Sequence, residues 1–245
     1  MSKTNFLILI PIFLLLSCSE SKEPESPANK QIQEYTKSLE ECKEDDKTKT
    51  GSQSENKSKE HVRSFAPEPD DIVFGNKEAK VVVVEYFSPT CPHCVTYHKK
   101  IYPSIKSKFV DTGRIAYVIR EFIGNKQDLD AAILARCKGD IGSYNNFIKI
   151  LLEQQENWAF DKNYREIITN IGVLGGVSPE QYTACLKNDA LMATLMANSK
   201  LVLKDPGFIG TPSFFINGTM YKKPYTLEDL SSAIEEADKA IANGK

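Results

Sequence analysis

Two cysteines separated by two residues are the most reactive feature of the sequence. Cys91-Pro92-His93-Cys94 follows an apolar segment and opens a segment with helical periodicity. Free backbone N–H groups and the dipole at a helix N-terminus stabilise an anion, and His93 can add a positive charge or a donor beside the Cys91 sulfur. A lowered thiolate pKa makes a cysteine reactive at neutral pH. Because Pro92 and the tight spacing hold both sulfurs within reach, this segment predicts thiol–disulfide exchange.

Other uses of the cysteine pair stay open at this point. A haem attachment motif needs a histidine directly after the second cysteine, where Val95 stands. A zinc site could use His98, one turn beyond Cys94, but no second cysteine pair has metal-ligand spacing. A purely structural disulfide is also possible in principle, although this step at a helix start is more typical of redox sites. We therefore predict no metal and no cofactor, and we interpret His98 as a half-exposed helix residue.

An acid inside an apolar strand is the second candidate. Glu85 lies within residues 81–87, whose sequence is VVVVEYF. A carboxylate there is costly to bury unless it is paired or functional. The structural alternative is an ion pair with a base, for which Arg120, near the end of the next expected strand, is a candidate.

Hydrophobic periodicity places the elements that must position these groups. The continuous apolar run at 81–87 is typical of a strand buried on both faces, and residues 114–120 form a second such run. The segment between them is helical in pattern, with a kink expected at Pro103. Two parallel strands and a crossover helix make a right-handed βαβ unit.

The C-terminal part of the sequence indicates a hairpin and a helix. Residues 126 to about 204 have helical periodicity, with a break at residues 172–176. Asn217-Gly218 then separates two short apolar runs, which is a strong signal for a type I′ hairpin, and Thr226 can cap a last helix. The order predicts an α/β fold with a βαβ half, a ββα half and helices inserted between them.

The N-terminal quarter of the chain differs in character from the rest. An apolar run at residues 6–16 is too short to cross a bilayer, which takes about 20 residues, and suits a signal peptide over residues 1–17. It ends in Leu15-Leu16-Ser17-Cys18, which resembles the lipobox of bacterial lipoproteins, where the cysteine is lipidated. An ordinary signal peptide with a nearby cysteine is the alternative.

Residues 18–66 are predicted to be a disordered polar tether. They are rich in charged residues and contain too few apolar side chains to offset the conformational entropy of folding. Ile32, Tyr35, Leu39 and Cys42 recur at helical spacing, so a transient or oligomerisation helix is an open alternative. The folded body is then expected over residues 67–245.

The amino-acid composition of the chain restricts the kinds of molecule that it can bind. The 245 residues carry a formal net charge of −2, with 26% charged and 41% hydrophobic residues. A near-neutral chain is a poor candidate for binding nucleic acid through phosphate neutralisation. We therefore expect no nucleic-acid partner, and contact with a membrane only through a lipid anchor at Cys18.

The motifs resemble those of the DsbA family, which has a thioredoxin fold with an inserted α-helical domain. The resemblance covers about residues 70–245 and rests on the run from residue 83 into Cys91-Pro92-His93-Cys94, on residues 210–218 (GTPSFFING), and on the helical block at about 125–204. It implies a protein thiol:disulfide oxidoreductase, and the family provides the standard example of a low thiolate pKa and a strongly oxidising disulfide.

The resemblance also implies a role for individual residues. Cys91 matches the exposed nucleophile and Cys94 the buried resolving thiol. Pro212 matches a cis-proline facing the pair, and the backbone of Thr211 before it would bind a substrate strand. Glu85 matches a buried acid that assists proton transfer around Cys94.

The remaining cysteines divide into a pair and a single residue. We predict a disulfide between Cys137 and Cys185, because export permits it and some relatives carry a second bridge in this domain. Two buried free thiols are the alternative. Cys42 is then unpaired within the chain, either free or linking two chains.

These features together predict an exported oxidase of protein dithiols, in the periplasm or cell envelope. Its substrates would be folding exported proteins with free thiols, and a quinone-linked membrane reoxidase of the DsbB or VKOR kind would reset it. A disulfide isomerase or reductase on the same scaffold is one alternative, and a non-catalytic surface lipoprotein is another.

Overall fold

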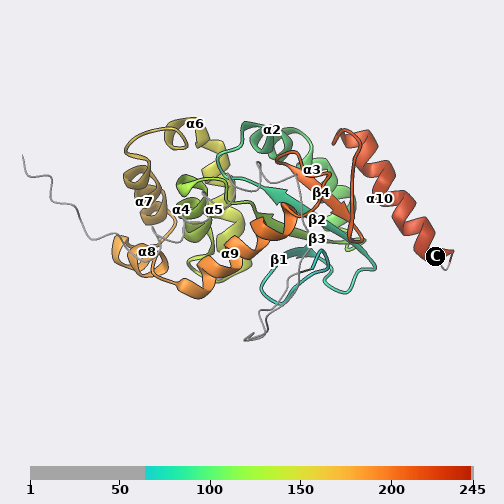
Figure 1. Ribbon diagram of the computed structural model, residues 1–245, viewed down its shortest axis with the longest axis horizontal. Helices are drawn as coiled ribbons and strands as arrows, with labels where there is room; N and C mark the ends of the chain where they lie inside the picture. The colour runs from blue at the N-terminus through green and yellow to red at the C-terminus, as the bar shows by residue number, and fades with distance from the viewer. Residues whose placement is uncertain (1–63, 244–245) are drawn as a thin grey trace, which may run out of the picture.

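The computed structural model describes residues 64–243 (Figure 1). The predicted signal peptide, the lipidation site Cys18, Cys42 and the tether up to residue 63 lie outside the described residues. Within residues 64–243, no helix combines the length and the hydropathy needed to cross a bilayer.

One mixed sheet forms the centre of the fold. The strand order is β1-β3-β2-β4-β5. Strands β2 and β3 are parallel, whereas the other neighbouring pairs are antiparallel. The bounds of the strands are β1 (Ile72–Gly75), β2 (Val81–Phe87), β3 (Ile115–Glu121), β4 (Ser213–Ile216) and β5 (Thr219–Met220).

The connection from β2 to β3 is the predicted crossover. It consists of α2 (Pro92–Lys100), α3 (Tyr102–Ile105) and the π-helical turn η1 (Lys106–Val110). The helix is interrupted at Ile101, close to Pro103, whose missing N–H removes a hydrogen bond from the helical ladder.

The hairpin and the last helix also form as the sequence indicates. Asn217 and Gly218 both have positive φ, at 48° and 79°, as a type I′ turn requires. Helix α10 (Leu227–Ala242) follows, and the Thr226 side chain accepts a hydrogen bond from the backbone N–H of Asp229 at its start.

Helices also fill the chain between β3 and β4, and Figure 1 shows them gathered at one end of the sheet. Among the described residues they are α4 (Lys126–Arg136), α5 (Ile141–Glu153), α6 (Gln155–Trp158), α7 (Tyr164–Leu174), α8 (Pro179–Cys185) and α9 (Asp189–Val202). The fold is therefore the mixed α/β sheet with inserted helices that the sequence predicts.

The two faces of the sheet bury different cores. On one face, Val83, Phe87 and Tyr117 pack with the crossover helices, α10 and the inserted helices in one large cluster. On the other face, Val84, Val118 and their neighbours form a smaller cluster. Because both faces are covered, β2 and β3 read as continuous apolar runs rather than alternating ones.

The folded body begins earlier than predicted. Residues 64–66, assigned to the end of the tether from their composition, lie on the smaller core. The Phe65 ring stacks on Phe215 at 4.1 Å between centroids. The guanidinium of Arg120 donates to the backbone carbonyls of Ser64 and Ala66, at 2.6 Å and 2.8 Å. A buried arginine thus fixes residues 64–66. The sequence of these residues alone does not reveal this contact.

Candidate active site

Cys91 lies in the chain between β2 and α2, directly before the helix. It is the N-cap residue of α2, with Pro92 in the first turn, and its own N–H donates to the carbonyl of Ser88. The Cys91 side chain is half-buried, whereas Cys94, one turn into the helix, is 0% exposed. Both cysteines are free thiols in the structure. One accessible and one inaccessible sulfur are what a nucleophile and a resolving thiol require.

The surroundings of the two thiols drive their pKa values apart. A hydrogen bond from Cys94 is the main reason why the pKa of Cys91 falls from 9.0 to about 5. Burial opposes this shift, while hydrogen bonds from Thr211 and the backbone N–H groups of Cys94 and His93 add to it. Burial raises the pKa of Cys94 well above 9.0, and Cys91 and the charge of Glu85 raise it further. Cys91 is therefore the thiolate at neutral pH.

The backbone N–H of His93 contributes to the lowered pKa of Cys91. The His93 side chain is exposed. The structure thus assigns the stabilisation of the thiolate to the helix N-terminus and to Cys94.

A cis-proline faces the cysteine pair. The Thr211–Pro212 peptide bond is cis, as the resemblance implied. The Cys91 sulfur lies 3.1 Å from the carbonyl oxygen of Thr211. Residues far apart in the sequence thus meet at the reactive sulfur.

A groove runs along this side of the site. It has a volume of about 640 Å³ and is bounded by residues 207 and 209–214, residues 220–225 and His93. Ile209 at its rim is 97% exposed. An extended chain bound in the groove would pass the Thr211–Pro212 bond next to Cys91.

Glu85 is buried but not with the partner suggested by the sequence. Its carboxylate accepts a hydrogen bond from Tyr117 at 2.7 Å and lies 2.9 Å from the Nε2 atom of His98. Arg120 is opposite Tyr86 in the register, so it points to the other face of the sheet from Glu85. Arg120 instead pairs with Asp71, at 2.6 Å. The suggested Glu85–Arg120 pair is therefore wrong.

The interpretation of His98 as half-exposed is also wrong. Its side chain is only 10% exposed, and it packs among aromatic rings, including that of Tyr102 at 5.0 Å between centroids. Helical periodicity could not show this burial, because Tyr102, which covers the imidazole, comes from α3, and the partner of the imidazole, Glu85, comes from β2.

A carboxylate that sequence reasoning missed holds the loop before Cys91. Asp128, in the first turn of α4, is 1% exposed. It accepts hydrogen bonds from the Ser88 hydroxyl at 2.7 Å, the Thr90 N–H at 2.9 Å and the Gly124 N–H at 3.1 Å. The Gln155 side chain donates to the carbonyl of Pro89 at 2.7 Å. The inserted helices therefore set the position of the active-site loop. An acid in the first turn of a helix was the available signal, but it is equally typical of a simple cap.

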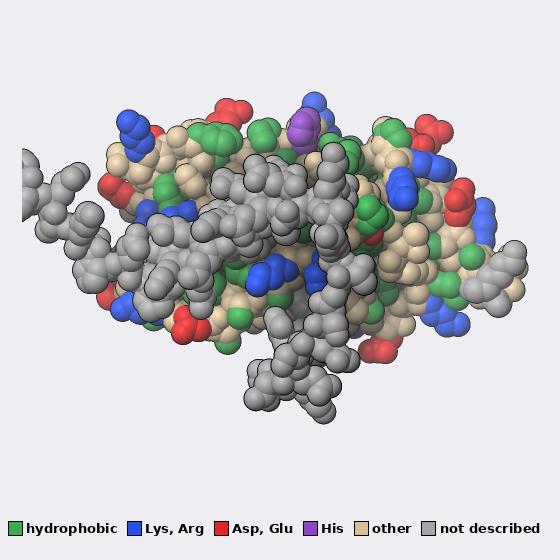
Figure 2. Space-filling model, viewed as in Figure 1, with side chains coloured by type: hydrophobic (Ala, Val, Ile, Leu, Met, Phe, Trp, Pro, Cys, Tyr) green, Lys and Arg blue, Asp and Glu red, His purple; other side chains and the backbone are tan. Residues whose placement is uncertain are grey.

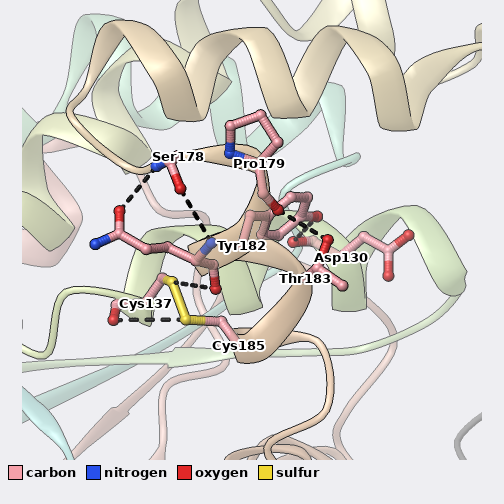
Figure 3. Close-up of a disulfide and its surroundings, with 8 residues drawn as sticks. Asp130, Cys137, Ser178, Pro179, Tyr182, Thr183 and Cys185 are labelled. Carbon is pink, nitrogen blue, oxygen red and sulfur yellow. Dashed lines mark hydrogen bonds between the residues drawn. A yellow bond between two sulfur atoms is a disulfide. The ribbon is translucent and has the colours of Figure 1, made fainter.

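A disulfide joins two of the inserted helices, as Figure 3 shows. Cys137, the residue after α4, is bonded to Cys185, the last residue of α8, across a sequence separation of 48. This is the pairing that the resemblance implied. Close by, Ser178 and Gln181 form a capping box at the start of α8, and the Tyr182 hydroxyl donates to the carbonyl of Asp130.

Comparison with known proteins decides the family. Residues 67–236 match the thioredoxin family. A protein of Rickettsia conorii, named as a protein-disulfide oxidoreductase, is 44% identical over 96% of this chain and 95% of its own length. A Rickettsia prowazekii protein with the same name is 56% identical over 71% of this chain, but the match spans only 64% of that protein.

The chain belongs to the thioredoxin family, among its DsbA-like protein-disulfide oxidoreductases.

Solved structures of DsbA-like proteins agree with this membership. The crystal structure of α-DsbA1 from Wolbachia pipientis superposes with a TM-score of 0.67, at 26% identity over 74% of this chain and 98% of that one. Oxidised BdbD of Bacillus subtilis has the same fold, with a TM-score of 0.63 over 73% of this chain and 98% of its own, at 22% identity.

Proposed function

We propose that this protein is a dithiol oxidase that introduces disulfide bonds into exported proteins through Cys91 and Cys94. The observation that carries the proposal is the geometry of the pair: half-buried Cys91 lies at a helix N-terminus beside the Thr211–Pro212 bond, and Cys94 is buried one turn later. This arrangement lowers the pKa of Cys91 to about 5 and raises that of Cys94. Stabilising the thiolate stabilises the reduced pair relative to the disulfide, and this makes the disulfide a stronger oxidant.

The geometry supports a specific order of steps. A substrate thiolate attacks the Cys91 sulfur of the Cys91–Cys94 disulfide, because Cys91 is the accessible partner. A bond forms between the substrate sulfur and Cys91, and Cys94 leaves with the electron pair and takes up a proton. A second substrate thiolate then attacks the substrate sulfur of the mixed disulfide, and Cys91 leaves as the stabilised thiolate. The substrate has lost two electrons, and the enzyme pair has gained them.

Two further groups serve these steps. The groove beside Thr211 and Pro212 would bind the extended substrate segment, with backbone hydrogen bonds of the kind a strand makes at a sheet edge. Glu85, which is buried in β2, would assist the transfer of the proton that Cys94 takes up. Its charge raises the pKa of Cys94, so the two groups are coupled electrostatically.

Oxidative folding of a reduced model protein tests this function. The wild type in its disulfide form is expected to oxidise the substrate, and Cys91→Ser is expected to abolish the reaction. Cys94→Ser is also expected to be inactive, because without Cys94 the disulfide that oxidises the substrate cannot form. The double variant Cys137→Ser/Cys185→Ser, which keeps the reactive pair, is the control. Full activity of Cys91→Ser would contradict the mechanism, and a wild type without oxidase activity would contradict the function.

We also propose that the protein acts in the periplasm or cell envelope, anchored by lipid at Cys18 and reoxidised by a quinone-linked membrane protein of the DsbB or VKOR kind. The Cys137–Cys185 disulfide supports an oxidising compartment. Mass spectrometry of the mature N-terminus is expected to find an acylated Cys18, whereas an unmodified start elsewhere would contradict the anchor. A Cys91 mixed disulfide with such a membrane protein, trapped by Cys94→Ser, would identify the reoxidase, and its absence from cells that keep the enzyme oxidised would contradict the proposed partner.

A further inference from the structure

The buried acid near Cys94 is linked to the surface by one side chain. Glu85 is 0% exposed, and its Oε1 atom lies 2.9 Å from His98 Nε2. Its Oε2 atom accepts the hydroxyl proton of Tyr117, which in turn lies 2.9 Å from the buried hydroxyl of Tyr97. The tyrosine hydroxyls extend this hydrogen-bonded cluster into the core. His98 is therefore the member of the cluster through which it approaches solvent.

His98 borders an open cavity on the side away from the substrate groove. The cavity has a volume of about 390 Å³ and lies between the crossover helices and α5, which contacts α2. The His98 side chain is 10% exposed, and Tyr102, Tyr144 and Leu152 form apolar parts of the wall. Water reaching this cavity would meet the imidazole before the carboxylate.

The burial of Cys94 makes a path for protons between solvent and the site necessary. When the Cys91–Cys94 disulfide opens, the Cys94 sulfur carries a negative charge at a position that is 0% exposed. An unpaired buried charge is costly, so the sulfur must take up a proton. Glu85 can give that proton only if it is itself supplied with another for the next turnover.

We propose, on the basis of the oxidase function above, that His98 is a positioning residue that passes protons between solvent in this cavity and Glu85. As substrate attacks Cys91, a proton held by the Glu85–His98 pair moves to the leaving Cys94 sulfur and forms the thiol. The pair, short of one proton, takes one from water in the cavity through the imidazole. The substrate sulfur bonds to Cys91 as the Cys91–Cys94 bond breaks, and the electron pair of the broken bond stays on the Cys94 sulfur.

The charged groups around His98 are compatible with this role. On the core side the imidazole lies 2.9 Å from the Glu85 carboxylate and packs against the rings of Tyr97 and Tyr102. The Tyr117 hydroxyl donates to the same carboxylate. Each tyrosine has a pKa raised by burial, so all three stay neutral hydroxyls at physiological pH.

At the mouth of the cavity the charges are lysines and one acid. The bordering side chains are Lys99, Lys106, Lys149 and Glu153. Lys106 pairs with Asp111 and Lys149 lies 3.9 Å from Glu153, so the mouth is polar and solvated.

The variants His98→Gln and Lys99→Gln separate this role from a structural one. Glutamine can still donate a hydrogen bond to Glu85 but does not carry a proton at neutral pH. Lys99 is the next residue and borders the same cavity, but its side chain is exposed whereas Glu85 is buried, so its variant is the matched control. The measurement is the rate at which a small dithiol reduces the Cys91–Cys94 disulfide between pH 5 and 9, as a ratio to the wild-type rate.

We expect the rate of His98→Gln to fall about tenfold at neutral pH, since proton transfer by a positioned side chain contributes at least that much. The deficit should shrink toward acid pH, where hydronium replaces the relay, while Lys99→Gln stays at the wild-type rate. Imidazole in the buffer should restore the rate of His98→Ala, since it can enter the enlarged cavity. The midpoint of the Cys91 thiolate absorbance should be unchanged and shows that the site is intact.

Two results would overturn the proposal. One is a wild-type rate for His98→Gln over the whole pH range. The other is a deficit of His98→Ala that imidazole does not relieve, because that pattern means His98 only holds the structure. Both leave the oxidase function standing, which fails only if the wild type cannot oxidise dithiol substrates.

Discussion

At the scale of single residues, the site depends on an asymmetry between two chemically identical side chains. Cys91 is half-buried at a helix N-terminus, and Cys94 is buried one turn later. The same short hydrogen-bonded pair therefore contains one stabilised thiolate and one stabilised thiol. The motif predicts the chemistry, whereas the degree of burial that separates the two roles comes from the helices packed over it.

The pKa of Cys91 gives a direct prediction at this scale. The thiolate absorbance of the reduced protein is expected to titrate with a midpoint near pH 5. Cys94→Ala should move the midpoint upward, because it removes the donor that lowers the pKa of Cys91 most. Cys94→Ser keeps a donor and should move it less. Equal midpoints for the two variants would show that the hydrogen bond from Cys94 does not set the pKa.

The same pKa shift predicts how pH affects the stability of the reduced protein. The pKa of Cys91 is depressed from 9.0 to about 5, so this group stabilises the fold fully above pH 9. The contribution declines as the pH falls and is lost through pH 5. Chemical unfolding of the reduced wild type and of Cys91→Ala across this range should show a difference that grows with pH, and a pH-independent difference would contradict the shift.

At the scale of elements, contacts between distant segments hold the active-site loop and the N-terminal segment. Asp128→Ala should lower the free energy of unfolding by about 2–4 kcal/mol, because it removes the buried carboxylate that accepts hydrogen bonds from the Ser88 hydroxyl and the Thr90 N–H. The comparison is Asp140→Ala, which removes the exposed N-cap acceptor of the Ser143 N–H at the start of α5 and should cost less than Asp128→Ala. Urea unfolding measures both, and similar losses would mean that the loop is not clamped.

The buried pair of Arg120 and Asp71 allows a second prediction for the elements. Both side chains are 0% exposed, so Arg120→Met should destabilise the protein by about 3–5 kcal/mol, since it leaves a buried carboxylate without its cation. Arg114→Met, which removes an exposed pair with Asp238, should cost less than about 1 kcal/mol. A small loss for Arg120→Met would show that the segment at residues 64–71 is not fixed by this arginine.

Local patterns predicted the elements well and their cross-contacts poorly. The apolar run at β2, the Asn217-Gly218 turn and the Thr226 cap depend on neighbours in sequence, and each has the expected conformation. The partners of Glu85 and Arg120 depend on which face of the sheet each residue occupies and on helices that arrive later in the chain. A single sequence contains no local signal for either.

At the scale of the whole molecule, the inserted helices pack together with the part of the fold that carries Cys91 and Cys94. Helix α4 carries Asp128 at its start, which holds the loop before Cys91, and is followed by the bridge to α8 at its end. The surface is mixed in charge: Figure 2 shows basic and acidic side chains interspersed on the visible face.

The disulfide between the inserted helices should stabilise the fold without carrying out the reaction. Closing a loop with a sequence separation of 48 contributes about 2–4 kcal/mol. Cys137→Ser/Cys185→Ser should lose stability by this amount in thermal or urea unfolding and still oxidise a small dithiol. If the double variant lost the reaction while folded, the bridge would belong to the catalytic mechanism.

The central claim is that the Cys91–Cys94 disulfide is a strong oxidant, and its reduction potential tests this most directly. Thiol trapping of the wild type across a glutathione series reports the fraction oxidised. We expect a reduction potential near that of DsbA, which is about −120 mV, because the Cys91 thiolate is stabilised. A potential near the about −270 mV of thioredoxin would contradict the account and identify the pair as a reductant.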